Sequence, residues 1–588
     1  MLRRKLDKML SYGRGSQLLL LFMVVIAFFL LFLLISAICG WNYGWQDIIA
    51  LFLDPGGFGG AGEHDGFRLF ATLIGIFLFS TLFISVVSNI FDNVSESAKN
   101  GAMRYRIKNH ILILGANHQL LPMLHALEKE PLKQDIVIMT KNNVEKLNAE
   151  IASRFAGSPF MNKIVLYHGA WDTLDELKTA LPQWAEKIYI LGDGGTDSDS
   201  TNIRCCNLLK HICETANKVI FCYLIMENGS SFDLFMKSEK SISTDKLKID
   251  IVNSREYAAE QVLAGDRFLP VIKADDPRHS HFVVLGTGGI AKAIAFTVAN
   301  NSHYPKLNGA IRHTRISIIG SGMRTWMDNL VASRPGLFQR ARYSYIAPDG
   351  TEERHLPQND FLDVEWEFID MSDTSPLARK MIESWAADHE HQALSMAICH
   401  SLQAERVASL MHLPPIVYDK LHPTPICIYL ESDAEIAISA MESGAYGIIK
   451  PFGPAMGNSN DPLFKERSKR GILVNAVYNV GRKGMSNYDL SSAWYNGTEA
   501  DKFASTYCAN ALDFRWANFD PLGNREPIYE AEYRRWVMTK LLMNLEHPCI
   551  VPYNEVPPSK TDNFKNIIDW MLDTYKEKGE FPKYKNIW

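Results

Sequence analysis

The sequence predicts a membrane α-helical hairpin, two tandem α/β domains with Rossmann-like parallel sheets, and a mainly α-helical C-terminal region. Three observations support this fold class. Two long, uncharged apolar runs lie near the N-terminus, at 17–39 and 69–90. Short apolar runs alternate with amphipathic stretches from residue 109, and the same alternation restarts at residue 281. Apolar runs separated by helices are typical of parallel, doubly wound sheets.

The predicted boundaries follow these changes in pattern. They are a basic N-terminal segment 1–16, a two-helix module 17–95, a first α/β domain 105–275, a second α/β domain 276–458 and a helical region 459–588. Within the module the spans are predicted at 17–39 and 68–91, joined by a loop at 44–66. At about 1.5 Å per residue, each span is long enough to cross a hydrocarbon core of about 30 Å.

The charges around the two apolar runs predict their orientation. Basic residues precede the first run and follow the second, whereas the joining loop has only Arg68 against four acidic residues. Lys and Arg accumulate on the cytoplasmic side of membrane helices. We therefore expect an inner (plasma) membrane protein with both termini in the cytoplasm.

Composition argues against several other classes of protein. The net charge is −5 at pH 7, so no basic excess indicates a nucleic-acid partner. The nine cysteines lack the paired spacing typical of zinc sites, and we interpret them as core residues of a reducing compartment. No metal cluster, nucleophile or paired-carboxylate site stands out, so we expect no metal and no catalytic residues.

The loop between the apolar runs predicts a re-entrant pore helix followed by an ion filter. The apolar stretch 48–53 precedes an acidic, glycine-rich segment, and glycine reaches the dihedral angles that aim carbonyl oxygens at an ion. The negative end of the helix dipole would also favour a cation. The predicted loop residues are Asp54, Pro55, Gly56, Gly57, Gly59, Gly60, Gly62, Glu63 and Asp65. The alternative is a plain two-helix anchor with a flexible turn.

One face of the second apolar helix is predicted to line the pore. Thr81, Ser85, Ser88 and Asp92 recur at spacings of four, three and four, which places them on one stripe of a helix. A hydrated pathway needs such side chains. The alternative is that small hydroxyl residues only pack the helices.

The turns after the first strands of the two α/β domains differ. The first domain has Gly115 but no glycine triad, and its second strand ends in Thr140 where a ribose-binding acid is expected. The second domain has the dinucleotide fingerprint, although its second strand ends in Gly320 and Ser321. We expect a nucleotide-derived ligand with its phosphate on the helix N-terminus there, with close helix packing as the alternative. The candidate binding residues are Gly286, Gly288, Gly289 and Ala291.

The acidic turn at 192–200 suggests calcium as another gating effector. Asp193, Asp197 and Asp199 would be its ligands, but the turn lacks the glycine and the final glutamate of an EF-hand loop. Residues 197–200 are also favourable caps for the helix that follows, which is the interpretation we prefer.

Four stretches together resemble channels gated by regulator-of-conductance (RCK, TrkA-N-like) domains, above all the CASTOR and POLLUX ion channels and their bacterial relatives. They are LDPGGFGGAG, SVVSNIFDNVSESAKNG, NHILILGANHQLLPMLHAL and ILGDGGTDSDSTNIRCCNLL. The resemblance implies a homotetramer whose tandem domains form a cytoplasmic ring that responds to a small-molecule effector and gates permeating cations. Because the loop lacks the TVGYG of dedicated potassium channels, potassium and calcium both stay open as the permeating ion.

The C-terminal region resembles the RyR domain, the small helical repeat named for ryanodine receptors. The matching positions are Arg534, Arg535, Trp536, His547, Pro548, Val551, Pro552, Tyr553, Glu555, Pro557, Lys560 and Asp562. Tyr533 stands where the repeat often has a histidine. The resemblance implies a regulatory or packing module. We expect Arg534, Arg535 and Trp536 to hold an anionic aromatic ligand. The alternatives are that the arginines are solvated surface charges and that Trp536 only fills a core.

These features predict a ligand-gated cation channel subunit that is not an enzyme. The first alternative is a non-conducting, membrane-anchored nucleotide sensor or defence effector. The second is an anchored NAD-dependent oxidoreductase, which the missing ribose acids and catalytic residues disfavour.

Overall fold

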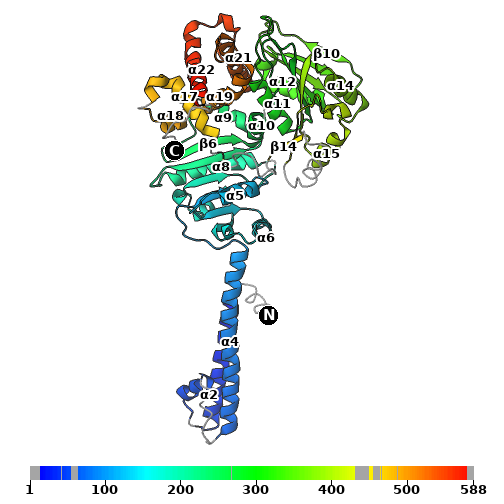
Figure 1. Cartoon of the computed structure of the whole chain (residues 1–588). Coiled ribbons are helices and arrows are strands. Elements are labelled where there is room, and N and C mark those ends of the chain that lie inside the picture. The colour runs from blue at the N-terminus through cyan, green and yellow to red at the C-terminus, as the bar shows by residue number, and fades with distance from the viewer. Residues whose placement is uncertain are drawn as a thin grey trace. The chain divides into compact units, whose positions relative to one another are not determined.

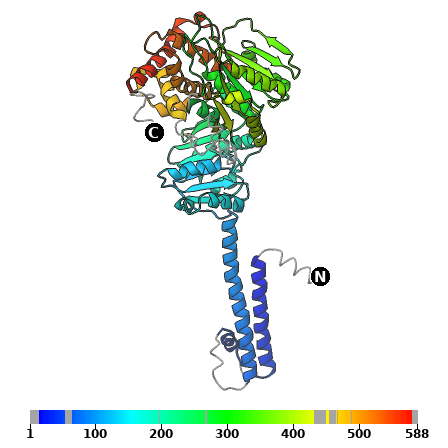
Figure 2. The same cartoon turned by 45° about the vertical axis from the view of Figure 1, so that its right-hand side comes forward.

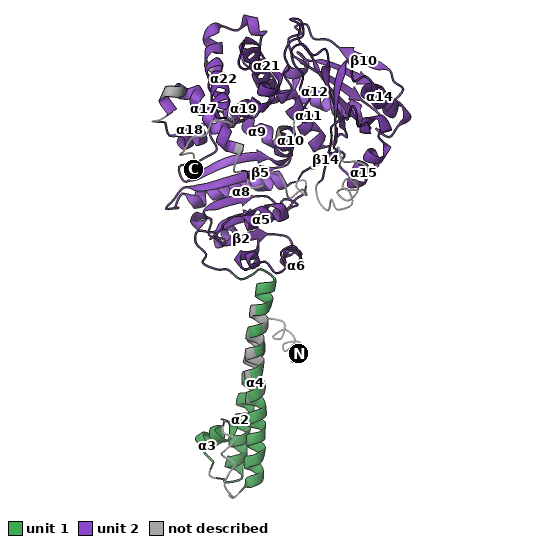
Figure 3. Ribbon diagram, viewed as in Figure 1, with its two compact units in different colours: residues 1–103 green, residues 104–588 purple. Residues whose placement is uncertain are grey.

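The computed structural model describes residues 14–41, 43–53, 64–195, 197–265, 268–430, 449–453, 464, 467–485 and 488–578. The chain divides into two compact units, residues 1–103 and residues 104–588 (Figure 3).

The first unit is a helical hairpin with a short third helix. The long helices α2 (Arg14–Ile38) and α4 (Asp65–Lys99) run side by side in Figure 2. The short helix α3 (Trp45–Leu53) packs against both, around a core that includes Phe32 and Phe52. A Cβ added at Gly75 of α4 would lie 2.5 Å from the Phe52 Cα, so α3 and α4 touch backbone to backbone. Searched over the described residues, no helix combines the length and the apolarity needed to cross a membrane.

The first α/β domain of the second unit contains a six-stranded parallel sheet (Figure 1). Its strands are β1 (Ile111–Leu114), β2 (Ile136–Thr140), β3 (Ile164–His168), β4 (Lys187–Ile190), β5 (Ile220–Met226) and β6 (Leu247–Asn253). The spatial order β3-β2-β1-β4-β5-β6 is that of the Rossmann fold, which confirms the predicted sheet type.

Helices connect these strands and bury several of the cysteines that were predicted to be core residues. They are α5 (Leu120–Lys129), α6 (Val144–Arg154), α7 (Leu174–Thr179), α8 (Ser198–Cys213), α9 (Gly229–Met236) and α10 (Ser254–Gly265). Cys205, Cys206 and Cys213 of α8 lie in the core as predicted, and burial raises the pKa of Cys206 to about 11. Cys39 is exposed and Cys549 is half-buried, so the core interpretation is wrong for Cys39 and incomplete for Cys549.

The second α/β domain repeats this strand order and extends it. Its strands are β7 (His279–Leu285), β8 (Thr314–Ile319), β9 (Arg342–Ile346), β10 (Glu352–His355), β11 (Val364–Ile369), β12 (Gln392–Ile398), β13 (Ile426–Tyr429) and β14 (Ile449–Phe452). Its helices are α11 (Gly289–Asn301), α12 (Met323–Ser333), α13 (Pro335–Phe338), α14 (Pro376–Ala387) and α15 (Gln403–His412). The order β11-β8-β7-β12-β13-β14 matches the first sheet, and the antiparallel pair β9 and β10 is added beyond β11.

The C-terminal region is mainly helical and shares its core with both α/β domains. It contains α17 (Arg467–Gly484), α18 (Leu490–Asn496), α19 (Glu499–Asn510), α20 (Leu512–Asn518), α21 (Glu526–Leu542) and α22 (Pro558–Lys578). Helix α21 packs against α11, and α19 packs against α9, where the rings of Phe503 and Phe232 lie 5.9 Å apart. The predicted C-terminal region therefore shares one core with the first α/β domain and another with the second.

Candidate functional site

In the first α/β domain, the carboxylate of Asp193 lies on the turn that follows β1. It accepts a hydrogen bond from the Ala116 amide (2.8 Å) in that turn. It also accepts from the Thr140 hydroxyl (2.5 Å) and the Lys141 amide (3.1 Å) at the end of β2. The Trp171 indole N–H, after β3, donates to it at 2.8 Å. A single carboxylate that follows β4 is thus hydrogen-bonded to residues at the ends of three other strands.

This carboxylate occupies the positions that a dinucleotide uses in a binding domain. The ligand's phosphate bonds the turn after the first strand, and its ribose lies near the end of the second strand. Gly115, with φ of +93°, packs so tightly that an added Cβ would lie 2.3 Å from the backbone of Gly192. The first turn is therefore closed by the protein's own acid, in line with its missing fingerprint.

The acidic turn that contains Asp193 does not gather a calcium site. Asp199 accepts hydrogen bonds from the amides of Glu227 (3.0 Å) and Asn228 (2.8 Å), which follow β5. Asp197 is the N-cap residue of α8, but its side chain makes no capping bond, so the predicted side-chain capping by Asp197 is wrong. Within the part of the chain that the structure describes, no group of three or more His, Cys, Asp or Glu residues is placed to hold a metal.

In the second α/β domain, the turn after β7 is open. Gly286 has φ of +118°, and an added Cβ would lie 2.8 Å from the His400 amide nitrogen, so this position requires glycine. Gly288 is the N-cap of α11 and, as a glycine, offers no side-chain cap of its own. The first amides of a helix lack intrahelical partners and lie at the positive end of its dipole, so they can donate to an anion. Ala291 is buried in the core, where it serves packing.

One guanidinium group lies against this helix N-terminus, and a second bonds the neighbouring Ser401. Arg255 of α10 lies over Gly289, where an added Cβ would be 2.3 Å from its Nη1. Its Nη2 forms an ion pair with Glu227 at 3.8 Å, and its side chain is 33% exposed. Positive charge at the N-terminal end of a helix is unfavourable unless an anion compensates it.

The second guanidinium belongs to Arg406 of α15, which is only 3% exposed. Its Nη2 donates weakly to the Ser401 carbonyl (3.5 Å), and its buried Nε has no hydrogen-bond partner among the described residues. The Ser401 hydroxyl in turn lies 2.8 Å from where a Gly288 Cβ would stand. The site therefore lies between β7 and β12, the topological switch point of the sheet, where open α/β domains bind ligands.

Arg535 of the RyR-like motif lies away from any ligand surface. It is 2% exposed and donates to Glu532 (2.8 and 2.9 Å) and to the Thr539 hydroxyl (2.7 Å). Arg515 also pairs with Glu532, and burial lowers the pKa of both arginines, that of Arg515 to about 10. The expectation that Arg535 holds an anionic ligand is wrong, because its charge is buried and paired.

The aromatic residues of this motif pack onto α21. The rings of Trp536 and His547 meet edge to face at 5.0 Å. Tyr553, which with Glu555 belongs to a short 3₁₀ helix (Tyr553–Glu555), donates its hydroxyl to Glu526 at 2.8 Å. His547, Pro548 and Pro552 shape the loop that leads there. Trp536 therefore packs against His547 and is only partly buried, and its predicted contact with a ligand stays a prediction.

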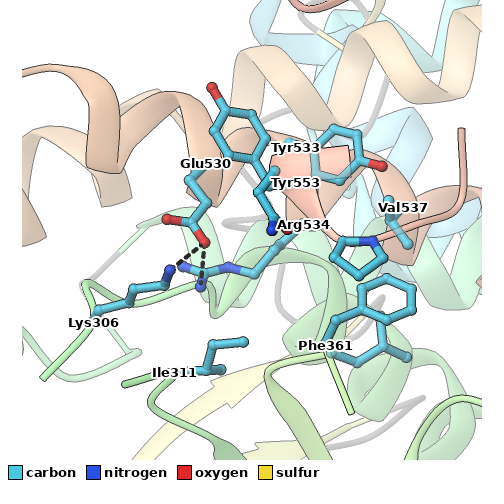
Figure 4. A pocket seen from close by; sticks show the side chains of 11 residues that line it. Lys306, Ile311, Phe361, Glu530, Tyr533, Arg534, Val537 and Tyr553 are labelled. Carbon is cyan, nitrogen blue, oxygen red and sulfur yellow. Dashed lines mark ion pairs between the residues drawn. The ribbon is translucent and has the colours of Figure 1, made fainter. Parts of the chain in front are cut away.

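Arg534 lines a cavity of about 170 Å³ between α21 and the second α/β domain (Figure 4). Its Nε lies 3.1 Å from the buried Asp363, and its Nη2 donates to the Tyr304 carbonyl (3.1 Å). Lys306, Glu530 and Tyr533 also line the cavity. One wall of this cavity could have been found in the sequence, because four of its residues follow the spacing of one helix face. They are Glu530, Tyr533, Arg534 and Val537.

Five of the predicted pore residues belong to α4. Asp54, Pro55, Gly56, Gly57, Gly59, Gly60, Gly62 and Glu63 fall outside the described residues. Asp65 begins α4, and Thr81, Ser85, Ser88 and Asp92 all belong to that helix. Ser88 is exposed, and the side chains of the other three lie outside the described part.

No protein-family model matches the chain, and no curated protein sequence matches it. Among the solved structures that it resembles is the GsuK channel, at 14% identity and a TM-score of 0.39, over 75% of this chain and 94% of that one. The GsuK channel bound to NAD shares 11% identity at a TM-score of 0.41, over 76% of this chain and 83% of that one. The structure of GsuK bound to ADP shares 13% identity at a TM-score of 0.39, over 76% of this chain and 97% of that one. Identities and TM-scores this low establish no more than a distant likeness.

Proposed function

We propose that this chain is a subunit of a ligand-gated cation channel of the inner membrane, with both termini cytoplasmic and four copies around one pore. The packing of α3 supports this most directly. A short apolar helix packs against two long ones, close enough to α4 to need Gly75, and it ends immediately before the acidic, glycine-rich segment. One hairpin cannot enclose a pore, so several must assemble.

The apolar surface of the hairpin supports a membrane location. Large apolar side chains of α2 and α4 are exposed, among them Phe22, Leu30, Leu34, Phe70 and Phe77. An exposed apolar surface of this kind is costly in water and favourable in lipid.

The tandem α/β domains act as the gating ring, and the open turn of the second one receives the effector. A phosphate-bearing ligand there would satisfy the amides of α11 and the charges of Arg255 and Arg406. Helix α11 also packs against α21, so the RyR-like region would sense the same event. A tenfold difference in affinity between open and closed states, about 1.4 kcal/mol per site, gives a steep response over four sites.

Single-channel recording from purified protein in planar bilayers tests the proposal, with nucleotides and calcium as candidate effectors. We expect cation currents that depend on a phosphate-bearing effector. Cysteines placed at Thr81, Ser85 and Ser88, in a background with the exposed Cys39 changed to Ser, should react with water-soluble thiol reagents in the open state. A cysteine at Phe83 serves as the control on another face of α4. Protection at all three positions with labelling at 83 would reject the pore-lining assignment.

The acidic loop should set cation preference. Asp54→Asn should shift the reversal potential in a salt gradient more than Glu63→Gln or Asp65→Asn, because screening is weakest nearest the narrow path. Unchanged reversal potentials in all three variants would exclude this loop as the filter. Effector binding without current in any condition would favour the alternative, a membrane-anchored sensor that does not conduct.

A further inference from the structure

The cavity between α21 and the second α/β domain has a chemistry different from that of the anion site on α11. We propose that it binds a small, uncharged aromatic amide. The inference concerns binding alone and does not depend on conduction through the hairpin.

The size and walls of the cavity suit one aromatic ring. Its volume is about 170 Å³, and an engineered apolar cavity of about 150 Å³ binds benzene. Phe361, Tyr533 and Tyr553 contribute aromatic surface, with Ile311 and Val537 beside them (Figure 4). The tyrosine hydroxyls are engaged elsewhere, with the Val551 carbonyl (2.8 Å) and with Glu526 (2.8 Å). The two rings therefore offer apolar surface to a ligand, which aromatic groups fill well.

The charges around the cavity balance, which selects against an anion. Lys306 and Arg534 are the cations, and Glu530 and the buried Asp363 are the anions. His303, which contacts Asp363 at 2.8 Å, is held neutral because burial lowers its pKa. An anionic ligand would add an uncompensated charge to a partly desolvated site. The charge balance therefore favours an uncharged ligand at Arg534 over the anionic ligand expected from the sequence.

The polar edge of the cavity matches a primary amide. Arg534 is buried (4% exposed), and its Nη1 makes no hydrogen bond within the described residues, since Glu530 Oε1 lies 3.7 Å away. The same Glu530 oxygen contacts Lys306 Nζ at 2.8 Å. A donor without a partner thus stands next to a carboxylate acceptor. A carboxamide presents the complement, with its carbonyl accepting from Nη1 and its NH₂ donating to Glu530.

Such a ligand would touch two parts of the protein at once. Lys306, Ile311 and Phe361 belong to the second α/β domain, whereas Glu530, Tyr533 and Arg534 belong to α21. Binding would therefore tie the RyR-like region to the domain that carries the anion site.

Benzamide and benzoate form a matched probe pair, because they share a shape and differ in charge. We expect saturation-transfer NMR on the purified full-length chain to show benzamide binding at least about tenfold tighter than benzoate. Ile311→Phe, which fills the cavity, should abolish binding. Ile416→Phe, the same change at another partly buried site of the same domain, should leave it intact.

A second variant keeps the test decisive if Ile311→Phe fails to fold. Glu530→Gln preserves shape, leaves the cations in excess, and should reverse the preference towards benzoate. Gly288→Asp should leave benzamide binding unchanged, which separates this site from the anion site on α11. Equal binding of both probes, no binding of either, or a preference unaffected by Glu530→Gln would overturn the proposal.

Discussion

The two α/β domains share one strand order and differ in the charge placed on the turn after their first strand. In the first domain the carboxylate of Asp193 bonds the Ala116 amide at 2.8 Å. In the second, the guanidinium of Arg255 lies over Gly289 at the start of α11. The shared fold therefore does not decide which domain binds a ligand, whereas one side chain on each turn does.

The sign of the charge on that side chain determines how the stability of each domain should depend on a ligand. An internal carboxylate satisfies the turn within the chain, so the first domain is complete without a ligand. An internal cation does not satisfy the donors of α11, so the second domain should gain stability if an external anion binds there. Effector dependence is thus expected in the second domain.

Adding a methyl group at the first glycine of each turn tests how tightly the turns are built, and it should have the largest effect. Gly115→Ala forces a Cβ to within 2.3 Å of the Gly192 backbone at φ of +93°. Gly286→Ala meets the His400 and Cys399 backbone at 2.8–2.9 Å. Backbone atoms yield little, so we expect a loss of about 4 kcal/mol for Gly115→Ala and less for Gly286→Ala.

Calorimetric melting of the full-length chain measures both losses. Gly157→Ala is the control, because its φ is +79° but nothing lies within 4 Å of an added Cβ. It isolates the backbone strain, about 1 kcal/mol. Equal losses at positions 115 and 157 would show that the first turn is not packed against β4.

Removing the internal acid tests whether it stands in for a ligand. Asp193→Ala leaves its four donors without their acceptor, and we expect a loss of about 3 kcal/mol. Inorganic phosphate should then raise the melting temperature of the variant more than that of the wild type. Asp197→Ala, which removes a side chain without a capping bond, should change stability little. A variant that phosphate does not rescue would mean that Asp193 only braces the strands.

The sequence predicted most of the scaffold because apolar runs and turn glycines are local signals. It did not reveal the role of Asp193, because that role needs donors from the ends of three strands that only the folded sheet brings together. Strand β6 escaped recognition because Lys248 and Asp250 interrupt its apolar pattern. Asp250 is buried and accepts from the hydroxyl of Tyr495 in the C-terminal region, a partner more than two hundred residues away.

The candidate sites also combine features that the sequence showed with features that only the fold reveals. The fingerprint glycines were visible in the sequence, but the flanking Arg255 and Arg406 come from helices outside the motif. Arg535 was expected to meet a ligand, because sequence alone does not show that Glu532, three residues earlier, pairs with it in a buried core.

Acid should act on both domains through buried histidines, among them His110 in the first domain and His281 in the second. Burial lowers the pKa of His110, which precedes β1, to about 4 and that of His281 in β7 to about 3. Between these values and the unfolded pKa of about 6.5, the unfolded chain binds more protons, so stability is lost as pH falls below 6.5. Each histidine should cost about 2 kcal/mol at pH 5.

Melting temperatures of the wild type, His110→Gln and His281→Gln between pH 7 and pH 3.5 measure these contributions. Each variant should lose part of the pH dependence. The His110 contribution should level off near pH 4, whereas that of His281 continues to grow below it. Identical pH profiles for all three proteins would exclude the buried histidines as the source of acid sensitivity.

Gly288→Asp tests the difference between the two turns most directly, because it places on the second turn the negative charge that the first turn already has. Gly288 has ordinary N-cap dihedrals (φ −74°, ψ 176°), and the nearest atom to an added Cβ is the rotatable Ser401 hydroxyl, so the backbone tolerates the change. Asp is a favoured N-cap, but Gly is nearly as good there, so we expect a gain of only about 0.3 kcal/mol in stability. The same carboxylate would repel a phosphate, so the half-maximal effector concentration should rise at least about tenfold. Gly288→Asn, which caps without charge, should give a similar gain and a smaller shift. A Gly288→Asp variant that is stabilised and keeps its half-maximal effector concentration would place the effector elsewhere, and both turns would then serve the same scaffold role.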